Sequence, residues 1–585
     1  MKKRRSPYLV TKSLKQYLLA SIITMAVFNL NTLVDGILMG NFLGPDALSA
    51  INLCLPVTNS ITALGILLST GAVLISANAL GQMDRSRMNE VFTLASIAQW
   101  IAGLLLLCVS APLSGVLAGL VSGGGELAPL CEKYIRVLLA GSAVLMYANT
   151  FSSFVEVNGY PKTVTVIMSL SVLVNLLLDV LLVGVLGVDI SGPAWASVAG
   201  SMVSVTCLIV FAARKKGMLK LSFHIEKPLV KLGEIIAKSV PQMISVISLT
   251  ALQLICNFFI QMAQGKSGIF VLSVGYNILG LSSMVCSGMA SAFMAIGGSM
   301  MGQKDYQGLR YLYRRGMMIC ILTSLAFLLL SLLIPRPLAA LFGADSEELL
   351  VLAVRGIPLI CTFILAITVV IPCSIHFQVI GRFALSSVAS LSIIASVLVS
   401  FLLISGTLAD ERIWLAFPLA SILCLLTVAA GAGLVKRSAG NKVTFPDLVP
   451  DAEPEIHKLD LSIACTEEAY QKGMQELWCW LGTSNYSTLS MKIAHSVEEL
   501  LLNCIQHSGG DANHDIDVLI RGDGQEVTAL LKDDGVPFNT SVSLAGNKTY
   551  GLMMAQHFCK NIEYNYSFGL NMTMLKWSLT ELEES

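Results

Sequence analysis

The sequence predicts an α-helical membrane protein with about twelve spanning helices, followed by a smaller α/β domain. Three observations lead to this fold class. Of the 585 residues, 55% are hydrophobic and only 13% are charged, whereas soluble domains carry about 25% charged residues. The hydrophobic residues gather in long runs that stop near residue 440. A short motif also recurs within those runs at a fixed offset, which indicates a duplicated unit.

The long apolar runs are the candidate membrane helices. A hydrocarbon core about 30 Å thick needs roughly 20 residues of helix, and about twelve runs between Gln16 and Val435 reach that length. The expected spans are 16–39, 47–80, 91–117, 134–157, 163–186, 193–213, 237–262, 268–301, 316–341, 349–377, 383–406 and 413–435. The first run follows basic residues but has no cleavage site of small residues, so we expect it to be retained as a helix.

Charge divides the chain near residue 450. Residues 451–585 hold 8 Lys and Arg against 20 Asp and Glu, which leaves 30 against 18 in residues 1–450. The basic residues of the first part recur in every second loop, and this pattern places those loops and both termini in the cytoplasm of a cell-membrane protein. We expect no nucleic-acid partner, because such binding depends on clustered Lys and Arg and the C-terminal part is acidic.

An internal repeat divides the apolar part into two units. The motif Gly81-Gln82-Met83-Asp84 returns as Gly302-Gln303-Lys304-Asp305, 221 residues later. Further pairs at this offset, or within two residues of it, are Gly44 with Gly265, Gly159 with Gly381, and Trp195 with Trp414. Each pair has the same place in a six-helix unit. We therefore expect two units of equal orientation, related by an axis along the membrane normal, with a pathway between them.

These positions resemble the multidrug and toxic compound extrusion (MATE) transporters. The resemblance rests on Asp35–Gly44, Gly159–Lys162, Ser191–Ala196 and the two Gly-Gln-x-Asp motifs, and it covers roughly residues 10–440. It implies a two-lobed fold, with lobes at 1–230 and 231–436, that alternates access between the two sides of the bilayer. It further implies an antiporter that exports small organic, cationic compounds in exchange for H⁺ or Na⁺. The compound and the choice of ion stay open.

Acidic residues within the apolar runs are the candidate coupling site, because an ionisable group at that depth is costly. The runs contain Asp35, Glu156 and Asp179, all in the first unit, and Asn175 lies one helical turn before Asp179 on the same face. One MATE branch holds its ion with an Asp on the first helix and an Asn-x-x-x-Asp pair on the fifth. The resemblance therefore assigns cation coupling to Asp35, Asn175 and Asp179. The alternative is that Asp179 lies near the membrane surface and caps a loop.

The C-terminal part is predicted to be a separate domain. Residues 437–457 are polar and contain three prolines, which indicates a linker, and residues 458–585 are enough for one domain. The pattern predicts strands at 458–464, 515–521 and 526–531, helices at 467–481, 488–507 and 551–558, and a hairpin around Ser567–Gly569. We expect an α/β sandwich with an antiparallel or mixed sheet.

Three clusters in this domain carry candidate chemistry. Glu499 and Asn503 lie one turn apart on a helix, a strand ends in Asp533-Asp534-Gly535, and Gly551-Leu552 opens a helix whose free N–H groups suit phosphate. In this order they resemble the GHKL (histidine-kinase-like, Bergerat) ATP-binding domains, and most closely the anti-sigma-factor serine kinases, over roughly residues 460–580. The resemblance implies ATP and Mg²⁺, with Glu499 as catalytic base, Asn503 as Mg²⁺ ligand, and Asp533, Gly535, Gly551 and Leu552 at the nucleotide.

The last cluster departs from that pattern. Met553 stands where the family has a second glycine, and the loop Val542–Tyr550 is short for an ATP lid, so binding of ATP is better supported than its hydrolysis. The sequence thus predicts a cation-coupled exporter with a cytoplasmic ATP-binding domain that regulates it or signals. One alternative is a membrane sensor whose C-terminal domain phosphorylates Ser or Thr of a cytoplasmic regulatory protein. Another is a domain that binds a partner without hydrolysing ATP.

Overall fold

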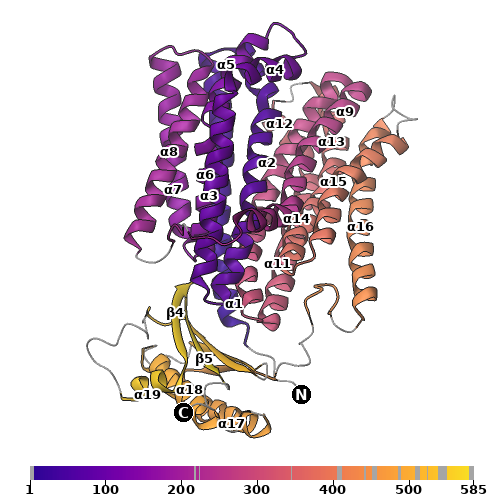
Figure 1. Cartoon of the computed structure of the whole chain (residues 1–585). Coiled ribbons are helices and arrows are strands. Elements are labelled where there is room, and N and C mark those ends of the chain that lie inside the picture. The colour runs from indigo at the N-terminus through magenta and orange to yellow at the C-terminus, as the bar shows by residue number, and fades with distance from the viewer. Residues whose placement is uncertain are drawn as a thin grey trace.

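Long helices form a bundle with a small α/β domain at one end in the computed structural model (Figure 1). The structure describes residues 6–215, 219–222, 224–343, 346–404, 411–440, 443–450, 457–484, 486, 489–507, 514–522, 525–537 and 550–578. In the first half of the bundle the elements are α1 Tyr8–Phe42, α2 Pro45–Gly81, α3 Arg85–Cys108, α4 Ser110–Ser122, α5 Ala128–Ala140, α6 Ser142–Val157, α7 Pro161–Asp179, η1 Val180–Val185 and α8 Ser191–Arg214. In the second half they are α9 Pro228–Ala292, η2 Phe293–Gly297, α10 Gly298–Gly302, α11 Tyr306–Leu333, α12 Pro335–Leu341, α13 Glu347–Cys361, α14 Phe363–Val379, α15 Phe383–Ile404, η4 Glu411–Leu415 and α16 Ala416–Ala439.

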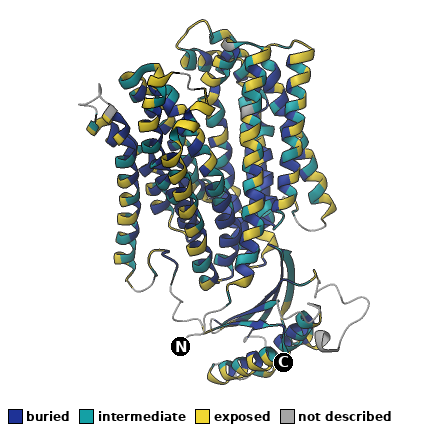
Figure 2. Ribbon diagram, turned by 180° about the vertical axis from the view of Figure 1, so that it is seen from behind, coloured by how far each residue is buried: buried dark blue, intermediate teal, exposed yellow. Residues whose placement is uncertain are grey.

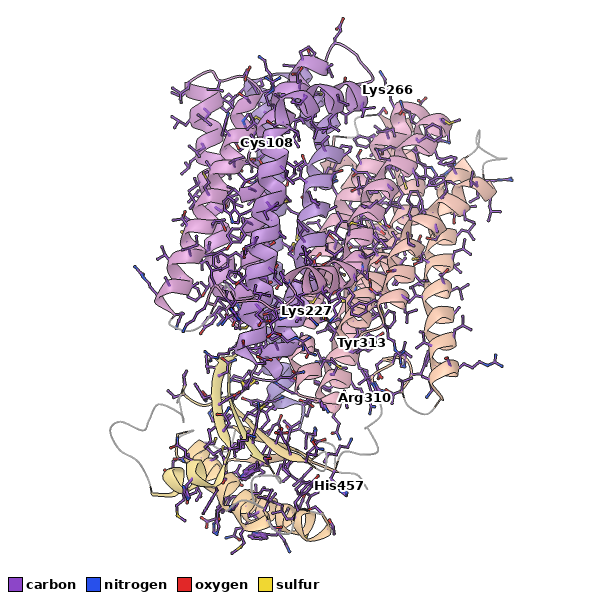
Figure 3. The ribbon with its side chains drawn as sticks, viewed as in Figure 1. Cys108, Lys227, Lys266, Arg310, Tyr313 and His457 are labelled. Carbon is purple, nitrogen blue, oxygen red and sulfur yellow. The ribbon has the colours of Figure 1, made fainter. Side chains whose placement is uncertain are left out.

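Continuous apolar helices are fewer than the twelve spans expected from the sequence, because the longest of them contains two expected spans. Among the described residues, ten helices are long and apolar enough to cross a membrane, or eleven if α5 and α6, which meet at a 53° bend, form one span. The expected spans 237–262 and 268–301 both lie within α9 and the segment that follows it, which is too long for a single crossing and consists of two helices that meet at a kink. Gly265 makes this kink with φ 57° and ψ −144°, a conformation that suits glycine. The neighbouring Lys266 lies at the end of the bundle far from the α/β domain (Figure 3).

The outer surface of the bundle is apolar, as lipid contact requires. Buried residues lie where helices face one another, and exposed residues cover the outside (Figure 2). Many of the exposed side chains are large and hydrophobic, including Leu105, Leu173, Leu177, Leu329, Leu403 and Leu426. In water such a surface would promote aggregation, whereas in a bilayer it is the expected one.

The internal repeat reappears in the backbone. Gly44, between α1 and α2, and Gly265, in the kink of α9, both have positive φ, at 86° and 57°. The two Gly-Gln-x-Asp motifs also turn in the same way, because Met83 and Lys304 have φ of 58° and 55°. Positive φ is uncommon outside glycine, so this agreement at the predicted offset supports a true duplication.

The two halves meet through these motifs at the end of the bundle next to the α/β domain. A Cβ on Gly81 would lie 2.0 Å from the backbone oxygen of Ser299, and one on Gly302 would lie 2.1 Å from the backbone oxygen of Asn78. Asn78 and Ser299 are themselves 221 residues apart, so each half makes the same contact with the other. The bundle is therefore closed at this end by a pair of contacts related by the repeat.

The C-terminal domain is a two-layer sandwich, as the sequence predicts. Its strands are β1 His457–Ala464, β2 Asp515–Gly522, β3 Glu526–Asp533, β4 Asn561–Ser567 and β5 Leu570–Ser578, and its helices are α17 Glu467–Thr483, α18 Ser490–His507 and α19 Tyr550–Phe558. The sheet has the order β1-β2-β3-β5-β4, and every pairing is antiparallel. One face of the sheet packs against the helices through alternate residues such as Val518, Ala529 and Leu575.

The other face of the sheet is also apolar and packs against the bundle. Leu519, Leu530 and Met574 are register partners across three strands, and all three belong to the core that the membrane helices form. A sheet with one solvent-exposed face would carry polar residues at these positions. The domain therefore has two covered faces, with its own helices on one side and the bundle on the other (Figure 1).

The segment predicted as a linker, residues 437–457, is not a free tether over residues 443–450. Asp447 there is fully buried and accepts a hydrogen bond from Arg314 at 3.1 Å. Its backbone oxygen lies 2.7 Å from Nε2 of the buried His376. Sequence patterning missed this docking because the segment is short and contains both polar and apolar residues.

Candidate functional site

Two acidic residues that the sequence singled out meet inside the bundle. Asp35 lies in α1, and Asp179 is the last residue of α7, where that helix passes into the π-helix η1. Their carboxyl groups lie close enough to interact with each other, and Asp179 is 1% exposed. Two carboxyl groups in contact cannot both stay ionised unless a proton or a metal cation lies between them.

Several oxygen atoms around this pair lack a partner. Among the described residues, Oδ1 of Asp35, Oδ1 of Asp179 and Oδ1 of Asn31 are buried without a hydrogen bond. An unsatisfied buried oxygen is costly, and carboxylate and amide oxygens are the ligands that hard cations prefer. The cluster of Asp35, Asp179 and Asn31, here called the carboxyl cluster, therefore suits a proton or a small hard cation.

Asn175 is placed beside the carboxyl cluster, but its amide is engaged elsewhere. It is buried on α7 one turn before Asp179, and its Nδ2 donates to Ser197 of α8 at 3.5 Å. The structure thus places Asp35 and Asp179 near each other and leaves Asn175 linking α7 to α8. An oxygen ligand from Asn175 stays a prediction.

Sequence reasoning missed two neighbours of the pair. Asn31 donates to Oδ2 of Asp35 at 2.9 Å, and Asn31-x-x-x-Asp35 has the same spacing as the pair on α7, which was a usable signal. Tyr134 of α5 lies close enough to interact electrostatically with both carboxyl groups. No spacing in the sequence links Tyr134 to them. Glu156, the third acid, lies apart at the other end of the bundle, where its backbone oxygen accepts a hydrogen bond from Tyr17.

The second candidate site lies in the C-terminal domain, where α18 packs against α19 and β3. The Sγ of Cys504 donates to Oδ2 of Asp533 at 3.4 Å and so joins α18 to the end of β3. Burial, followed by the nearby Asp533, raises the pKa of the Cys504 thiol well above its usual value, so the thiol stays protonated. The three clusters that the sequence predicted for one site thus lie on α18 and on two elements that contact it.

ATP with Mg²⁺ is the group that the GHKL resemblance implies, and the described residues fit it. Oδ1 of Asp533 accepts from Gly535 N at 2.9 Å and from Asn571 Nδ2 at 2.8 Å, which fixes the carboxylate. Among the described residues, its Oδ2 meets only the weak thiol donor of Cys504, so this oxygen can accept the adenine amino group. Asn503 donates Nδ2 to the Glu499 backbone oxygen at 2.9 Å, which leaves its Oδ1 for Mg²⁺.

Part of the predicted nucleotide site lies outside what can be described. Gly551 and Leu552 lie in the first turn of α19, as expected, but nothing is described of their side-chain surroundings. Of the predicted lid Val542–Tyr550, only Tyr550 lies within the described residues. No group of three or more His, Cys, Asp or Glu capable of holding a metal occurs in the described part of the chain.

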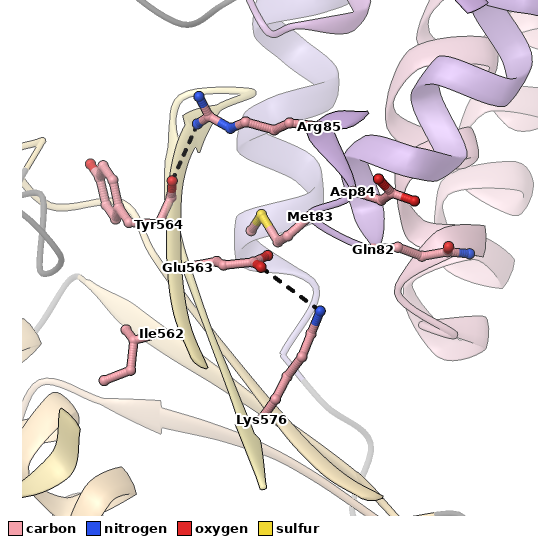
Figure 4. Close-up of a pocket in the computed structure, with 8 residues that line it drawn as sticks. All are labelled: Gln82, Met83, Asp84, Arg85, Ile562, Glu563, Tyr564 and Lys576. Atoms are coloured by element: carbon pink, nitrogen blue, oxygen red, sulfur yellow. Dashed lines mark hydrogen bonds and ion pairs between the residues drawn. The ribbon is translucent and has the colours of Figure 1, made fainter. Parts of the chain in front are cut away.

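A polar cavity of about 770 Å³ lies between the bundle and the sheet (Figure 4). It is lined by Gln82–Asp84 of the first motif, by Arg85 at the start of α3, and by Ile562–Tyr564 and Lys576 of the sheet. Its charged groups already have partners: Arg85 donates to the backbone oxygen of Tyr564 at 3.4 Å, and Lys576 lies 4.0 Å from Glu563. With both signs of charge in balance, this cavity indicates no particular ligand.

Comparisons with known proteins concern the bundle. A model of the MatE family matches residues 20–181 and 241–404. The chain is similar to the multidrug export protein MepA of Staphylococcus aureus (strain NCTC 8325 / PS 47), at 24% identity over 277 residues, which are 46% of this chain and 61% of the relative. MepA of Staphylococcus haemolyticus (strain JCSC1435) is 21% identical over 301 residues, 51% of this chain and 66% of the relative. The matches thus span less than two thirds of the relatives' length.

Solved structures show the same fold. A MATE family transporter of the MOP superfamily in an outward-facing conformation superposes with a TM-score of 0.67 at 22% identity, covering 75% of this chain and 99% of that one. A MOP superfamily transporter from Pyrococcus furiosus gives the same values, 0.67, 22%, 75% and 99%. At this identity the likeness establishes the fold of the bundle alone. The family match ends at residue 404 and does not extend into the C-terminal domain.

Proposed function

The chain belongs to the MatE family, whose model matches more than half of its residues, and from this membership we propose that it exports small organic cations in exchange for H⁺ or Na⁺. It is a multi-pass membrane protein. The observation that carries the proposal is the contact between Asp35 and Asp179, because such a pair needs a neutralising cation. The name of the relatives, multidrug export protein, supports the substrate class.

The proposed coupling is competition for the carboxyl cluster. A proton or Na⁺ that enters from the side opposite the C-terminal domain neutralises Asp35 and Asp179. This removes the charge that a cationic substrate needs, and it favours a state of the first lobe from which the substrate leaves outward. An ion shifts such an equilibrium only by its difference in affinity between the two states, and a buried carboxyl pair provides that difference.

Transport into vesicles tests the proposal. Proteoliposomes with the full chain should move a fluorescent organic cation when a H⁺ or Na⁺ gradient is imposed, without ATP on either side. An ionophore that collapses the effective gradient should stop the transport. Transport that needs ATP and ignores both gradients would overturn the proposal.

Asn31 gives a graded prediction for the same assay. Asn31→Ala removes the donor to Asp35 but keeps both carboxyl groups, so we expect transport to persist. The ion concentration for half-maximal rate should change by about 3- to 10-fold, the range for loss of one ordinary hydrogen bond. The matched control is Asn29→Ala. Asn29 is exposed on the same helix and donates to the backbone oxygen of Met25. An equal change in both variants would exclude a specific role for Asn31.

We further propose that the C-terminal domain binds ATP with Mg²⁺ in the cytoplasm and regulates the exporter. The arrangement of Asn503 and Asp533 supports this, as does the order of the three clusters. When ATP is bound, Mg²⁺ neutralises phosphate charge, while this chain's residues orient the nucleotide: Asp533 fixes the adenine and Asn503 supplies an oxygen to the metal. Glu499 is half-buried on the same helix and is the proposed general base.

Equilibrium binding of ATP to the purified full chain tests the nucleotide site. Asn503→Ala and Asp533→Asn should each weaken Mg²⁺-dependent binding by about tenfold or more, because each loses a contact to a charged or buried polar group. Glu498→Gln is the control, since Glu498 adjoins Glu499 but accepts a hydrogen bond from Tyr470. Absence of binding by the native chain, or full binding by both site variants, would contradict the proposal.

The same preparation distinguishes regulation from catalysis. If ATP binds and no phosphate is released or transferred, the domain regulates by binding. If ³²P from ATP appears on Ser or Thr of a cytoplasmic protein and Glu499→Gln abolishes this, the alternative of a protein kinase with a membrane sensor holds instead.

A further inference from the structure

We propose that ATP bound at Asp533 stabilises the closed contact between the two halves of the bundle, through the strand end Lys532-Asp533-Asp534. This rests on the proposed ATP binding and specifies what that binding regulates. The three residues are consecutive, yet each makes its main contact with a different part of the molecule.

Lys532 reaches the second half of the bundle. Its Nζ lies 2.9 Å from Oδ2 of Asp305, and the two side chains are 4% and 1% exposed. Asp305 belongs to the second Gly-Gln-x-Asp motif, where it also caps α11 by accepting from Gly308 N at 3.0 Å. The ion pair therefore ties β3 to the motif that closes the bundle.

Asp534 reaches the first half. Its Oδ2 accepts from Nζ of Lys12 at 2.5 Å and from the hydroxyl of Tyr8 at 3.1 Å, both on α1. From its own domain, Nδ1 of His514 lies 2.7 Å from Oδ1. Burial raises the pKa of Asp534, but the hydrogen bonds and charges of Lys12 and His514 lower it by more, so the net pKa is below the usual value and the residue stays ionised.

Asp533 lies between Lys532 and Asp534 in the chain, and its side chain points to the opposite face of the sheet. Side chains alternate along a strand, so Lys532 points to the bundle and Asp533 to α18, where it meets Cys504. A ligand that holds Asp533 thereby fixes the backbone from which Lys532 and Asp534 project. Oδ1 of Asp533 is already held by Gly535 and Asn571 while Oδ2 remains open to a donor stronger than a thiol, so the docked arrangement is also the one ready for adenine.

A second region of the sheet strengthens the docking. Phe568, at the tip of the β4–β5 hairpin, is 4% exposed, and its ring packs against that of Tyr17 in α1 with the centroids 5.6 Å apart and the planes tilted by 49°. Ser13 donates to the backbone oxygen of Phe568 at 2.9 Å. Gln303 of the second motif lies 3.4 Å from the sulfur of Met572 in β5. The sheet thus holds both halves at the end where Gly81 and Gly302 meet.

Separation of the halves at this end is opposed while the sheet is docked to both. It would break either Lys532 from Asp305 or Asp534 from Lys12, and a buried charge without its partner is strongly unfavourable. Because coupling between two sites is reciprocal, anything that weakens these two contacts must also weaken ATP binding. Substitutions on the bundle can therefore report on the nucleotide site without touching it.

The test measures ATP affinity of the full chain in nanodiscs with substitutions on the bundle side. Lys12→Met and Asp305→Asn should each lower ATP affinity at least threefold, and asparagine keeps the helix cap that Asp305 provides. The control is Arg521→Met, which breaks an ion pair of 2.6 Å to Asp460, at 11% and 8% exposure, within the domain itself. This control should leave ATP affinity within twofold.

Hydrogen exchange provides the second measurement. ATP should slow amide exchange in β4–β5 and at the start of α1 in the native chain, and this protection should be lost in Asp305→Asn. If the native chain binds ATP but both bundle variants bind it equally well and exchange is unchanged, the coupling is wrong while ATP binding stands. If the native chain does not bind ATP, the proposed nucleotide site fails and the coupling fails with it.

Discussion

Replacing Asp179 with asparagine is expected to abolish ion-driven export, with transport falling to the rate of protein-free vesicles. Asparagine keeps the size of the side chain and a hydrogen bond to Asp35, but it can neither bind a proton nor supply a negative charge to Na⁺. With only one carboxyl group left, no second negative charge repels it, so the site no longer requires a bound cation. Asp35→Asn should have the same effect, because the two groups act as one unit.

The matched control is Asp189→Asn. Asp189 lies in the loop before α8, pairs with Lys133 at 2.6 Å and is 46% exposed. Hydrogen bonds from Lys133 and Ser191 lower its pKa to about 2, so it stays ionised at neutral pH and cannot exchange a proton during transport. Asp189→Asn should transport like the native chain. Native rates in both Asp35→Asn and Asp179→Asn would remove the carboxyl cluster from the mechanism.

Alanine at Gly81 or Gly302 is expected to destabilise the closed end of the bundle. The added Cβ would overlap a backbone oxygen of the opposite half, at 2.0 Å and 2.1 Å respectively, and a backbone oxygen cannot move aside as a side chain can. We expect a loss of about 1–3 kcal/mol in the free energy of closure or unfolding, the range for overpacked sites. Because the two contacts are related by the repeat, the losses should be similar.

The predicted destabilisation is opposite in sign to the usual effect of replacing glycine with alanine in a helix. Glycine to alanine within a helix normally stabilises by up to about 1 kcal/mol. Gly433 in α16 has no heavy atom within 4 Å of a built Cβ, so Gly433→Ala should be neutral or stabilising. Thermal unfolding of the purified variants, together with transport, provides the comparison. Equal melting temperatures for Gly81→Ala, Gly302→Ala and Gly433→Ala would contradict the close contact.

Much of the bundle could be predicted from local patterns. Long apolar runs predict helices regardless of their partners. The repeat at 221 residues predicted a duplicated unit, and the matching backbone turns at Met83 and Lys304 agree with it. The expected spans 237–262 and 268–301 are two helices that meet at Gly265. The sequence does not give the angle between them, because glycine allows many backbone conformations and tertiary contacts select one.

The docking between domain and bundle could not be predicted. Lys532 and Asp305 are 227 residues apart, and neither has a spacing that points to the other. One signal was available, because β2, β3 and β5 carry apolar residues on both faces. Leu519, Leu530 and Met574 are those on the face opposite the domain's own helices. Apolar residues on both faces indicate that both faces of the sheet are covered. What covers the second face depends on the tertiary arrangement. The pairing of Asp35 with Asp179, in contrast, followed from a family resemblance.

The central claim is that substrate and coupling ion compete for the Asp35–Asp179 pair, and ion release on substrate binding tests it most directly. An organic cation added to the purified protein in weakly buffered solution should release protons, or previously bound ²²Na⁺, in proportion to the protein. The Asp35→Asn/Asp179→Asn double variant should release neither. Release of the same size from the double variant, or substrate binding by the native protein with no ion released, would contradict the account.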